Sequence, residues 1–398
     1  MTGNRKLRCT ACNAAYPVAE AFPRCLKCGE PVEMELVTKG APRDGNVLGQ
    51  TILERYGDFF PFDTDGGLTL NEGFTSLVRS NVAWSDSLYL KNETQNPTWS
   101  FKDRGTIMGL LHARALGFKK VGTVSTGNMA VSVAAYGARA GLKTYVLVDS
   151  RIPDEKIAPI AVYGPKVIKV EGAYDELYSQ SLEIGHREGI YFINSDVPFR
   201  IEGYKSIAFE ISEQLGFDVP EYVAVPTGSG GNIRGILKGF IEFYRAGITA
   251  RVPRMICCQA LGGAPIVKAH EEGLSEVRKA CNAETIASAI ANPYPPSGNE
   301  TLRKLREYDG LFVAVSDEEI VAAQKQLARD GIFGQPSSGV ALACVSKLVA
   351  EKKISGGDRV VCLVTGSGLK YIKAVEKHET TVYQCMISDL EKCMHSLA

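Results

Sequence analysis

The chain lacks a surplus of charge and any long apolar run. Its 398 residues include 45 lysines and arginines and 45 aspartates and glutamates, so the formal net charge is +0. Balanced charge provides no basic surface for nucleic acid or for an anionic membrane. No run approaches the roughly 18 apolar residues of a membrane span, and residues 1–30 lack the apolar core of a secretory signal. We therefore expect a cytoplasmic protein with neither a membrane nor a nucleic-acid partner.

Histidine and tryptophan are also scarce, with 5 and 2 residues in the whole chain. His112 and His186 lie in helical patterns, where an isolated histidine is more often solvated than catalytic. We therefore expect both to be exposed to solvent. Trp84 is expected to pack, whereas Trp99 lies inside the lysine motif described below and either narrows a pocket or fills space behind its loop.

Cysteine is plentiful, and four of the 11 cysteines form two Cys-x-x-Cys pairs. Twelve residues separate the pair Cys9 and Cys12 from the pair Cys25 and Cys28, and Gly29 follows as a knuckle turn requires. This spacing favours a tetrahedral zinc site, which four thiolates would close and so make structural. The alternatives are reduced, metal-free hairpins or an iron site. The remaining cysteines follow no metal spacing and are expected to be small buried residues: Cys257, Cys258, Cys281, Cys344, Cys362, Cys385 and Cys393.

The most informative segment is residues 96–105, Asn-Pro-Thr-Trp-Ser-Phe-Lys-Asp-Arg-Gly. The Asn-Pro pair signals a turn, and Ile107, Leu110 and Leu111 follow at helical spacing. Lys102 is therefore expected at a loop-to-helix junction. A lysine that is desolvated there, or held near positive charge, is neutral often enough to form a Schiff base. For an isolated Lys-Asp-Arg sequence a solvated lysine is the simpler interpretation, and the motifs further along the chain are what favour a nucleophile.

Three more polar loops each follow a strand-like apolar run. Residues 125–128 (Ser-Thr-Gly-Asn) precede a helical pattern, so their hydroxyl and N–H groups suit a polar ligand. Residues 228–232 (Gly-Ser-Gly-Gly-Asn) also precede a helix, and their glycines let the backbone approach a phosphate. Their spacing fits neither a dinucleotide fingerprint nor a Walker loop. Residues 364–370 (Val-Thr-Gly-Ser-Gly-Leu-Lys) form the third such loop.

An amine nucleophile and a phosphate-binding loop together suit pyridoxal phosphate, which offers an aldehyde, a phosphate, a phenolic oxygen and a ring nitrogen. On these motifs the chain resembles the fold-type II pyridoxal-phosphate enzymes and, among them, the threonine synthase family. The family's lysine motif has glycine where this chain has Trp99. Weaker matches occur at residues 71–77, 202–206 and 285–290, and the resemblance spans about residues 70–370 in the family's order.

The resemblance implies a role for each group around the cofactor. Lys102 would hold the cofactor as a Schiff base and act as the catalytic base. Asn128 would hydrogen-bond the phenolic oxygen, and Thr365 would lie beside the pyridine nitrogen, where a neutral hydroxyl leaves the ring unprotonated. The phosphate would bind to the glycine loop, which comprises Gly228, Ser229, Gly230, Gly231 and Asn232.

The activity implied by the resemblance is the conversion of O-phospho-L-homoserine and water into L-threonine and phosphate. Ser125 and Thr126, at a helix start, suit the substrate carboxylate. Arg104 and Lys205 are candidates for binding the substrate phosphate as charge-assisted donors. The full set of expected substrate contacts is Thr98, Ser100, Arg104, Ser125, Thr126 and Lys205.

Several departures from the family pattern leave the substrate open. Gln335 precedes Pro336 where the family usually has glutamate, and Ser367 and Tyr371 replace a common histidine and aspartate. One alternative is β-replacement on O-phosphoserine, as in cysteate synthase, because a shorter substrate needs a tighter pocket. Another is a serine or threonine dehydratase, which needs no second phosphate site. A third is a non-catalytic ribbon protein, against which the intact Lys102 and Asn128 argue.

Strand and helix patterns alternate along the chain, which indicates an α/β fold with mostly parallel sheets and ligands at the carboxyl ends of the strands. The strand-like runs are residues 144–148, 166–170, 191–194, 222–225, 254–260, 311–316 and 359–364. The main helical patterns cover residues 173–187, 317–331 and 339–352.

The resemblance further implies two sheet domains with the cofactor in the cleft between them, and a homodimer. The small domain would comprise residues 106–205, and the large domain residues 37–105 and 206–372. Residues 1–36 would form a zinc-ribbon-like segment, and residues 373–398 a C-terminal extension that packs on the large domain or forms a dimer contact.

Overall fold

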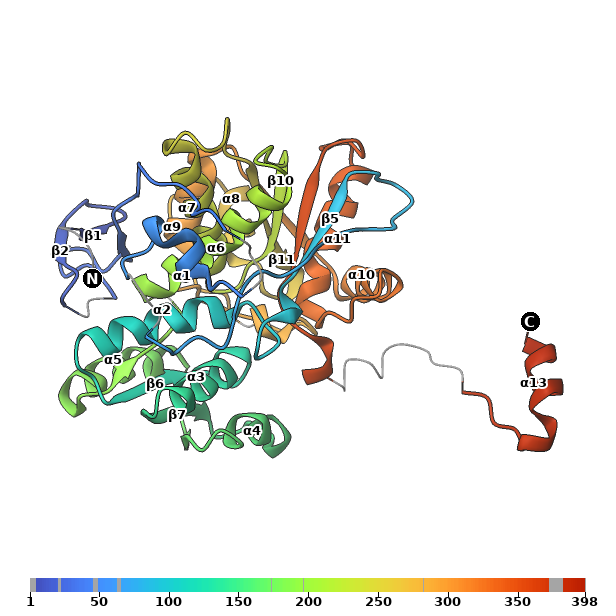
Figure 1. Cartoon of the computed structure of the whole chain (residues 1–398), viewed down its shortest axis with the longest axis horizontal. Coiled ribbons are helices and arrows are strands. Elements are labelled where there is room, and N and C mark those ends of the chain that lie inside the picture. Colours follow the sequence, from blue (N-terminus) through green and yellow to red (C-terminus); the bar gives the residue numbers. More distant parts are fainter. Residues whose placement is uncertain are drawn as a thin grey trace.

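Three sheets organise the part of the chain that the structure describes (Figure 1). The computed structural model describes residues 5–20, 23–45, 49–62, 66–172, 174–195, 197–281, 283–371 and 382–397. The N-terminal sheet is a small antiparallel ribbon with the order β2-β1-β3. Its strands are β1 (Lys6–Cys9), β2 (Ala15–Pro17) and β3 (Val32–Met34).

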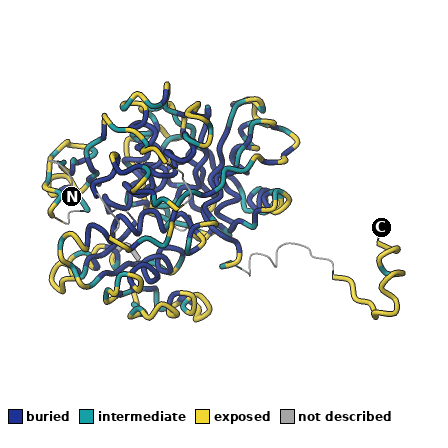
Figure 2. Tube along the Cα trace, viewed as in Figure 1, coloured by how far each residue is buried: buried dark blue, intermediate teal, exposed yellow. Residues whose placement is uncertain are grey.

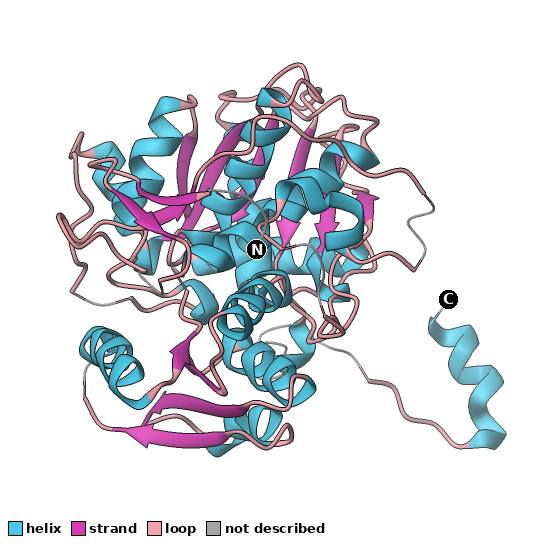
Figure 3. Ribbon diagram, turned by 60° about the vertical axis from the view of Figure 1, so that its left-hand side comes forward, coloured by secondary structure: helices cyan, strands magenta, loops and turns pink. Residues whose placement is uncertain are grey.

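The large sheet has the order β12-β11-β10-β13-β5-β4, and its strands are parallel except at the edge, where β4 runs antiparallel to β5. The small sheet has the order β8-β7-β6-β9 and is parallel throughout. Figure 3 shows the large sheet and the small sheet as separate layers with helices packed on their faces. The large sheet comprises β4 (Leu77–Arg79), β5 (Leu88–Asn92), β10 (Tyr222–Pro226), β11 (Arg254–Ala260), β12 (Leu311–Val315) and β13 (Val360–Val364). The small sheet comprises β6 (Lys120–Val124), β7 (Lys143–Asp149), β8 (Lys166–Val170) and β9 (Tyr191–Phe192).

The helices connect these strands and cover the sheets. Those of the first half are α1 (Ile52–Tyr56), α2 (Lys102–Ala115), α3 (Asn128–Arg139), α4 (Asp154–Ala161), α5 (Tyr174–Glu188) and α6 (Pro198–Gln214). Those of the second half are α7 (Gly231–Arg245), α8 (Pro265–Glu271), α9 (Gly298–Glu307), α10 (Asp317–Arg329), α11 (Pro336–Ala350) and α13 (Leu390–Leu397). Short 3-10 turns complete the set: η1 (Gly57–Phe59), η2 (Glu93–Gln95), η3 (Leu261–Gly263), η4 (Ser288–Ile290), η5 (Gly368–Lys370) and η6 (Ile387–Asp389).

Both faces of the large sheet are buried, and the strand residues alternate between two apolar clusters. In β10, Val223 and Val225 pack with residues of α6, α7 and α9, whereas Ala224 packs with residues of α10 and α11 on the opposite face. Successive strand side chains point to opposite faces, and a parallel sheet covered on both sides is apolar at every position. Figure 2 shows this buried interior as a continuous dark region.

The strands and helices expected from the sequence are present, with ends that shift by three residues or fewer. The long helix α6, the edge strand β4 and its neighbour β5 did not appear among the expected elements. Residues 198–212 of α6 are all buried, so the helix lacks the one-sided apolar stripe that reveals a surface helix.

Several individual expectations need correction. His112 is 1% exposed, because its ring stacks on Phe199 and its nitrogens contact the Tyr191 hydroxyl and the Val18 carbonyl. His186 is exposed, as expected. The seven cysteines outside the two Cys-x-x-Cys pairs were all expected to be buried. Four of them are buried, but Cys281 and Cys385 are exposed and Cys393 is partly exposed.

The C-terminal segment is exposed along the residues that the structure describes. Helix α13 lies apart from the body of the molecule in Figures 1 and 2. Residues 382–397 are exposed except for Cys393, and the expected packing of this extension on the large domain does not occur in this described part. No helix among the described residues is long and apolar enough to cross a membrane.

Candidate active site

The four motif loops converge because of the order of the strands. Strands β10, β13 and β5 are neighbours in the large sheet, so the segments that follow them leave from the same edge. The lysine motif pairs with the closing loop: Phe101 N–H donates to Thr365 O over 3.1 Å, and Ser367 N–H donates to Trp99 O over 3.0 Å. Asn128, from the loop after β6, reaches the same closing loop through Lys370. The parallel topology therefore places segments far apart in sequence around one site.

The lysine motif is braced by its own aspartate. Asp103 accepts hydrogen bonds from the backbone N–H and the hydroxyl of Thr98, both over 2.6 Å. Thr98 and Asp103 are both buried, so this loop is tied to the first turn of α2 by paired bonds. The turn carries Lys102 at the first helical position. Thr98, expected to contact the substrate, thus uses its hydroxyl proton for Asp103.

The amine of Lys102 lies in a setting that favours its neutral form. Burial lowers the pKa of Lys102 to about 7, and the nearby positive charge of Arg200 adds to the effect. Its ammonium position is 4.3 Å from the centre of the Phe101 ring. A nucleophilic lysine needs a depressed pKa of this kind, because only the neutral amine attacks a carbonyl carbon. The placement of Lys102 agrees with the expected loop-to-helix junction.

The glycine loop after β10 is shaped for a close approach of a ligand. Gly230 has a φ of +89°, and an added Cβ would come within 2.4 Å of the Thr301 hydroxyl. A Cβ on Gly231 would come within 2.9 Å of the Ser195 carbonyl. The first turn of α7 has no side-chain cap, which leaves its N–H groups and positive dipole end for an anion. The loop thus provides donors without side chains in the way.

Asn232 shows that this loop fits a phosphate. Both the amide nitrogen and the amide oxygen of its side chain are buried without a hydrogen-bond partner. The hydroxyl of Ser195 is in the same state, and its backbone carbonyl adjoins Gly231. Buried polar groups are normally satisfied, so orphaned ones at a glycine loop indicate a missing polar ligand. The residues present therefore fit the phosphate of pyridoxal phosphate.

Buried polar side chains around Thr365 of the closing loop form a connected hydrogen-bonded cluster. Asn128 donates to Gln335 over 2.8 Å, and Gln335 donates to Thr365 over 3.2 Å. The hydroxyl of Ser338 is 3.3 Å from that of Thr365. Asn128, Gln335, Ser338 and Thr365 are all buried, so this cluster has a fixed geometry.

Ser125 and Thr126 lie at the open edge of the site. Ser125 is half-buried and accepts a hydrogen bond from Gly127 N–H over 3.2 Å, while Thr126 is exposed. Helix α3 begins at Asn128 without a side-chain cap. The hydroxyl of Ser100 is buried without a partner beside this region, where the Ser100 backbone bridges to Gly366. These hydroxyls and free N–H groups suit a carboxylate.

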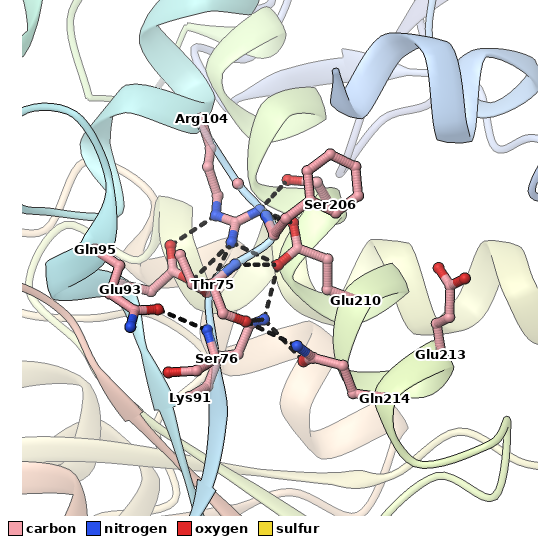
Figure 4. A network of polar contacts seen from close by, with 12 residues as sticks. Thr75, Ser76, Lys91, Glu93, Gln95, Arg104, Ser206, Glu210, Glu213 and Gln214 are labelled. Carbon is pink, nitrogen blue, oxygen red and sulfur yellow. Dashed lines mark hydrogen bonds and ion pairs between the residues drawn. The ribbon is translucent and has the colours of Figure 1, made fainter. Parts of the chain in front are cut away.

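Arg104 does not reach the site, which corrects its expected role with the substrate phosphate. Its guanidinium is fully buried and binds Glu93 over 2.6 and 2.8 Å and Glu210 over 2.5 and 2.8 Å. Lys91 holds the same Glu210 over 2.7 Å. Figure 4 shows Arg104 facing both carboxylates, so its guanidinium group does not point toward a ligand. Arg104 joins α2 to α6 instead.

Lys205 does not reach the site either, which corrects its expected role with the substrate phosphate. Its ammonium group is fully buried and binds Glu202 over 2.6 Å, Glu242 over 2.8 Å and the Phe59 carbonyl over 2.7 Å. All three protons of the ammonium group are therefore used within the scaffold. The sequence motif suggested Lys205 as a phosphate ligand, but α6 was not expected from the sequence, so nothing indicated which way this side chain faces.

Arg200 is the functional candidate that the sequence reasoning missed. Its side chain is fully buried in the first turn of α6, and its guanidinium donates to the Tyr204 hydroxyl, the Thr106 hydroxyl and the Lys102 carbonyl. Among the described residues no carboxylate forms an ion pair with it. A signal was present: Arg200 follows β9 in the same strand–loop–helix arrangement as the other loops. A buried cation without a carboxylate partner is suited to an anionic ligand.

The four knuckle cysteines come together in the ribbon. Their sulfur atoms all lie within 4.8 Å of one another, and the Cys9 and Cys28 sulfurs are 3.4 Å apart. The N–H groups of Ala11 and Cys12 point at the Cys9 sulfur over 3.4 Å. Four converging thiol groups with backbone N–H support can hold a metal ion.

Comparison with known proteins identifies the family. The family model described as "Pyridoxal-phosphate dependent enzyme" matches residues 68–366. Threonine synthase of Methanocaldococcus jannaschii is 38% identical over 98% of this chain and 99% of its own length. Threonine synthase of Methanosarcina acetivorans is 37% identical over 92% of each chain.

Solved structures share the fold at lower identity. A pyridoxal 5'-phosphate-dependent aspartate racemase superimposes with a TM-score of 0.64 at 21% identity, covering 76% of this chain and 92% of its own. Threonine deaminase isoform 2 of Solanum lycopersicum has a TM-score of 0.58 at 24% identity, covering 81% and 84%. The expected fold class is thereby confirmed. The chain belongs to the pyridoxal-phosphate-dependent enzyme family and, on its full-length relatives, to the threonine synthases.

Proposed function

We propose that this chain converts O-phospho-L-homoserine and water into L-threonine and phosphate. Two observations carry the proposal: burial lowers the pKa of the Lys102 amine, and the glycine loop, which follows β10 in the same sheet as β5 and β13, contains an Asn232 side chain without a hydrogen-bond partner. The curated relatives named threonine synthase, which match almost the whole chain, support the choice of reaction.

Bound pyridoxal phosphate supplies an electron sink that acidifies the proton on the substrate's α carbon. Lys102 would hold this cofactor, and its free amine would remove the proton from the substrate's α carbon and then one from the β carbon. Its lowered pKa keeps a large share of the amine unprotonated near neutral pH, as a general base requires. Asn128, Thr365 and the loop of residues 228–232 hold the cofactor in place.

The substrate's two anionic groups meet different parts of the site. Its carboxylate binds Ser125 and Thr126 at the start of α3, with Ser100 along the lysine loop, whereas Thr98 is left out because its N–H and its hydroxyl both donate to Asp103. Its phosphate binds near Arg200, which is a buried cation without a carboxylate partner among the described residues. Loss of phosphate from the γ carbon, return of one proton to the γ carbon and one to the α carbon, and addition of water at the β carbon would then give threonine.

The ribbon holds one structural zinc ion in this proposal. Cys9 and Cys25 are buried while Cys12 and Cys28 are exposed, so the site lies at the surface of the ribbon and is closed by four sulfur ligands. The remaining parts of the proposal are the division into large and small domains at residues 105/106 and 205/206, a homodimer, and a cytoplasmic location.

One assay distinguishes the proposed reaction from its alternatives. The protein loaded with pyridoxal phosphate is offered O-phosphohomoserine, O-phosphoserine with sulfite, or threonine, and the release of phosphate, amino acid and keto acid is measured. We expect threonine and phosphate in equal amounts from O-phosphohomoserine alone. Cysteate from O-phosphoserine would instead identify the β-replacement reaction, and keto acid from threonine would identify a dehydratase.

A further inference from the structure

Gln335 joins the two sides of the proposed cofactor site. It is 2% exposed and lies immediately before α11, where its backbone N–H donates to the Gly366 carbonyl over 2.9 Å. Its side-chain oxygen accepts a hydrogen bond from Asn128 over 2.8 Å, and its side-chain nitrogen donates to Thr365 over 3.2 Å. One buried amide thus connects the residue expected at the phenolic oxygen to the residue expected at the ring nitrogen.

Lys370 determines which groups donate and which accept in these hydrogen bonds. Its ammonium group donates to the Asn128 side-chain oxygen over 2.9 Å and also to the Thr98 carbonyl. A protonated lysine only donates, so it requires Asn128 to turn its oxygen toward it. The nitrogen of Asn128 then faces Gln335, which must present its own oxygen there and its nitrogen to Thr365. Every donor in this chain of contacts therefore points the same way, from Lys370 to Thr365.

This direction has a consequence for the two ends that face the ligand. Asn128 uses one of its two amide protons for Gln335, which leaves the second free to donate. Thr365 already accepts from Gln335, so its own proton is free for another acceptor. In the described structure this acceptor is the Ser338 hydroxyl at 3.3 Å, because Ser338 directs its own single proton at the Gly366 carbonyl over 3.1 Å; a ring nitrogen beside Thr365 would take the proton in place of Ser338. Both ends are therefore prepared as donors.

We propose that Gln335 is a positioning residue that makes Asn128 and Thr365 both hydrogen-bond donors toward the pyridine ring of the cofactor. The inference rests on the proposed function, because it takes Asn128 and Thr365 as the cofactor's neighbours. Two donors match an anionic phenolic oxygen and an unprotonated ring nitrogen. A glutamate in this place accepts hydrogen bonds only, so it would draw the Thr365 proton to itself and favour a protonated ring nitrogen.

The test compares Gln335→Glu, which keeps the shape and adds a charge, with Gln335→Met, which keeps the length and removes both hydrogen bonds. Each variant is loaded with pyridoxal phosphate labelled with nitrogen-15 in the ring, and the ring-nitrogen NMR shift is recorded. We expect the glutamate variant to move toward the protonated position. We expect the methionine variant to bind the cofactor on the order of tenfold more weakly, because two hydrogen bonds are lost.

Gln214→Glu is the matched control. Like Gln335, Gln214 accepts one hydrogen bond with its side-chain oxygen, from Lys91, and donates one with its side-chain nitrogen, to the Thr75 carbonyl, but these contacts involve neither Asn128 nor Thr365. Its variant should keep the nitrogen shift of the parent protein. A loaded Gln335→Glu protein with an unchanged shift overturns the inference, as does a Gln335→Met protein with unchanged cofactor affinity.

Two further variants separate the inference from the proposed function. Asn128→Ala and Thr365→Val remove the groups that are proposed to touch the cofactor. If both leave the nitrogen shift and the affinity unchanged, the proposed cofactor site is wrong. If they alter these quantities while the Gln335 variants do not, the site stands and only the role of Gln335 is refuted.

Discussion

The guanidinium of Arg200 donates a hydrogen bond to the backbone carbonyl of Lys102 over 3.4 Å. Arg200 is fully buried, and no described carboxylate forms an ion pair with it. A buried positive charge held against the first turn of α2 disfavours a second positive charge on the Lys102 side chain. The structure therefore links the reactivity of the lysine to an arginine 98 residues away in the chain.

Replacing Arg200 by methionine should raise the pKa of Lys102 above its present value of about 7. Only the neutral amine takes up pyridoxal phosphate, so uptake by the apoprotein should become slower at neutral pH, about tenfold for each unit of the shift. The measurement is the uptake rate as a function of pH. Arg200→Lys keeps the charge and should keep the midpoint, and a methionine variant with the parent's midpoint would show that Arg200 does not act on Lys102.

Lys102→Met should stabilise the apoprotein, and the gain should depend on pH. The pKa of Lys102 is 10.5 in its ordinary state and about 7 in the folded protein. At pH below both values the folded protein bears the full cost of burying the charge, which is a few kcal/mol. The cost declines as pH rises through this interval and vanishes above it. Urea denaturation across the interval should therefore show a shrinking difference from the parent, whereas a constant difference would refute the lowered pKa.

Arg104→Met should unfold the protein far more readily without acting on substrate binding. The change leaves Glu93 and Glu210 buried with a single remaining cation, Lys91, and breaking a buried pair in this way costs about 3–5 kcal/mol. Arg151→Met is the control, because its pair with Asp149 lies at the surface and contributes little to stability. A stable Arg104→Met protein with a raised KM would restore the substrate role that the structure denies.

The contrast between Lys102 and Arg104 shows what sequence reasoning reached in this chain. Lys102 and the glycine loop were found because the chemistry lies within one short segment bounded by turn and helix signals. Arg104 was misassigned because its partner Glu210 lies 106 residues away and only the folded arrangement of α2 against α6 brings them together. The sequence showed that Gln335 departs from the family pattern. It did not show the hydrogen bond with Asn128, because the two residues are 207 positions apart. Local pattern therefore indicated the chemistry, and long-range contacts decided which charges were free to take part.

Removal of the metal from the ribbon should lower stability more than activity. We expect one zinc ion per chain, lost in Cys9→Ser and Cys28→Ser, with the unfolding temperature lower by on the order of 5 °C. The ribbon contacts the body through Glu33 with Arg234, so its loss weakens packing on α7 without removing a residue proposed to touch the cofactor. Cys281→Ser is the control, because that thiol is exposed and outside the cluster. A metal-free protein that melts like the parent would refute the structural role.

Trp99→Gly should change which substrate the protein prefers while leaving its stability within about 1 kcal/mol of the parent. Trp99 has a φ of +59°, a conformation that costs a side chain about 1–2 kcal/mol, and its indole is 52% exposed. The ring contacts Lys370, whose amine lies 5.7 Å from its centre, and such a contact contributes about 0.5–1 kcal/mol. Relief of strain and loss of this contact therefore nearly cancel, so folding does not explain the tryptophan.

Of the two roles expected for the Trp99 ring, we therefore predict that it narrows the space for a substrate. Removing it should raise kcat/KM for O-phosphohomoserine relative to the shorter O-phosphoserine, and both constants are measured on the same preparation. Trp99→Asn is the matched variant, because asparagine tolerates a positive φ and restores part of the side-chain volume. It should give an intermediate ratio. If glycine and asparagine leave the ratio at the parent value, the ring only fills space behind its loop, and the walls of the substrate pocket lie elsewhere.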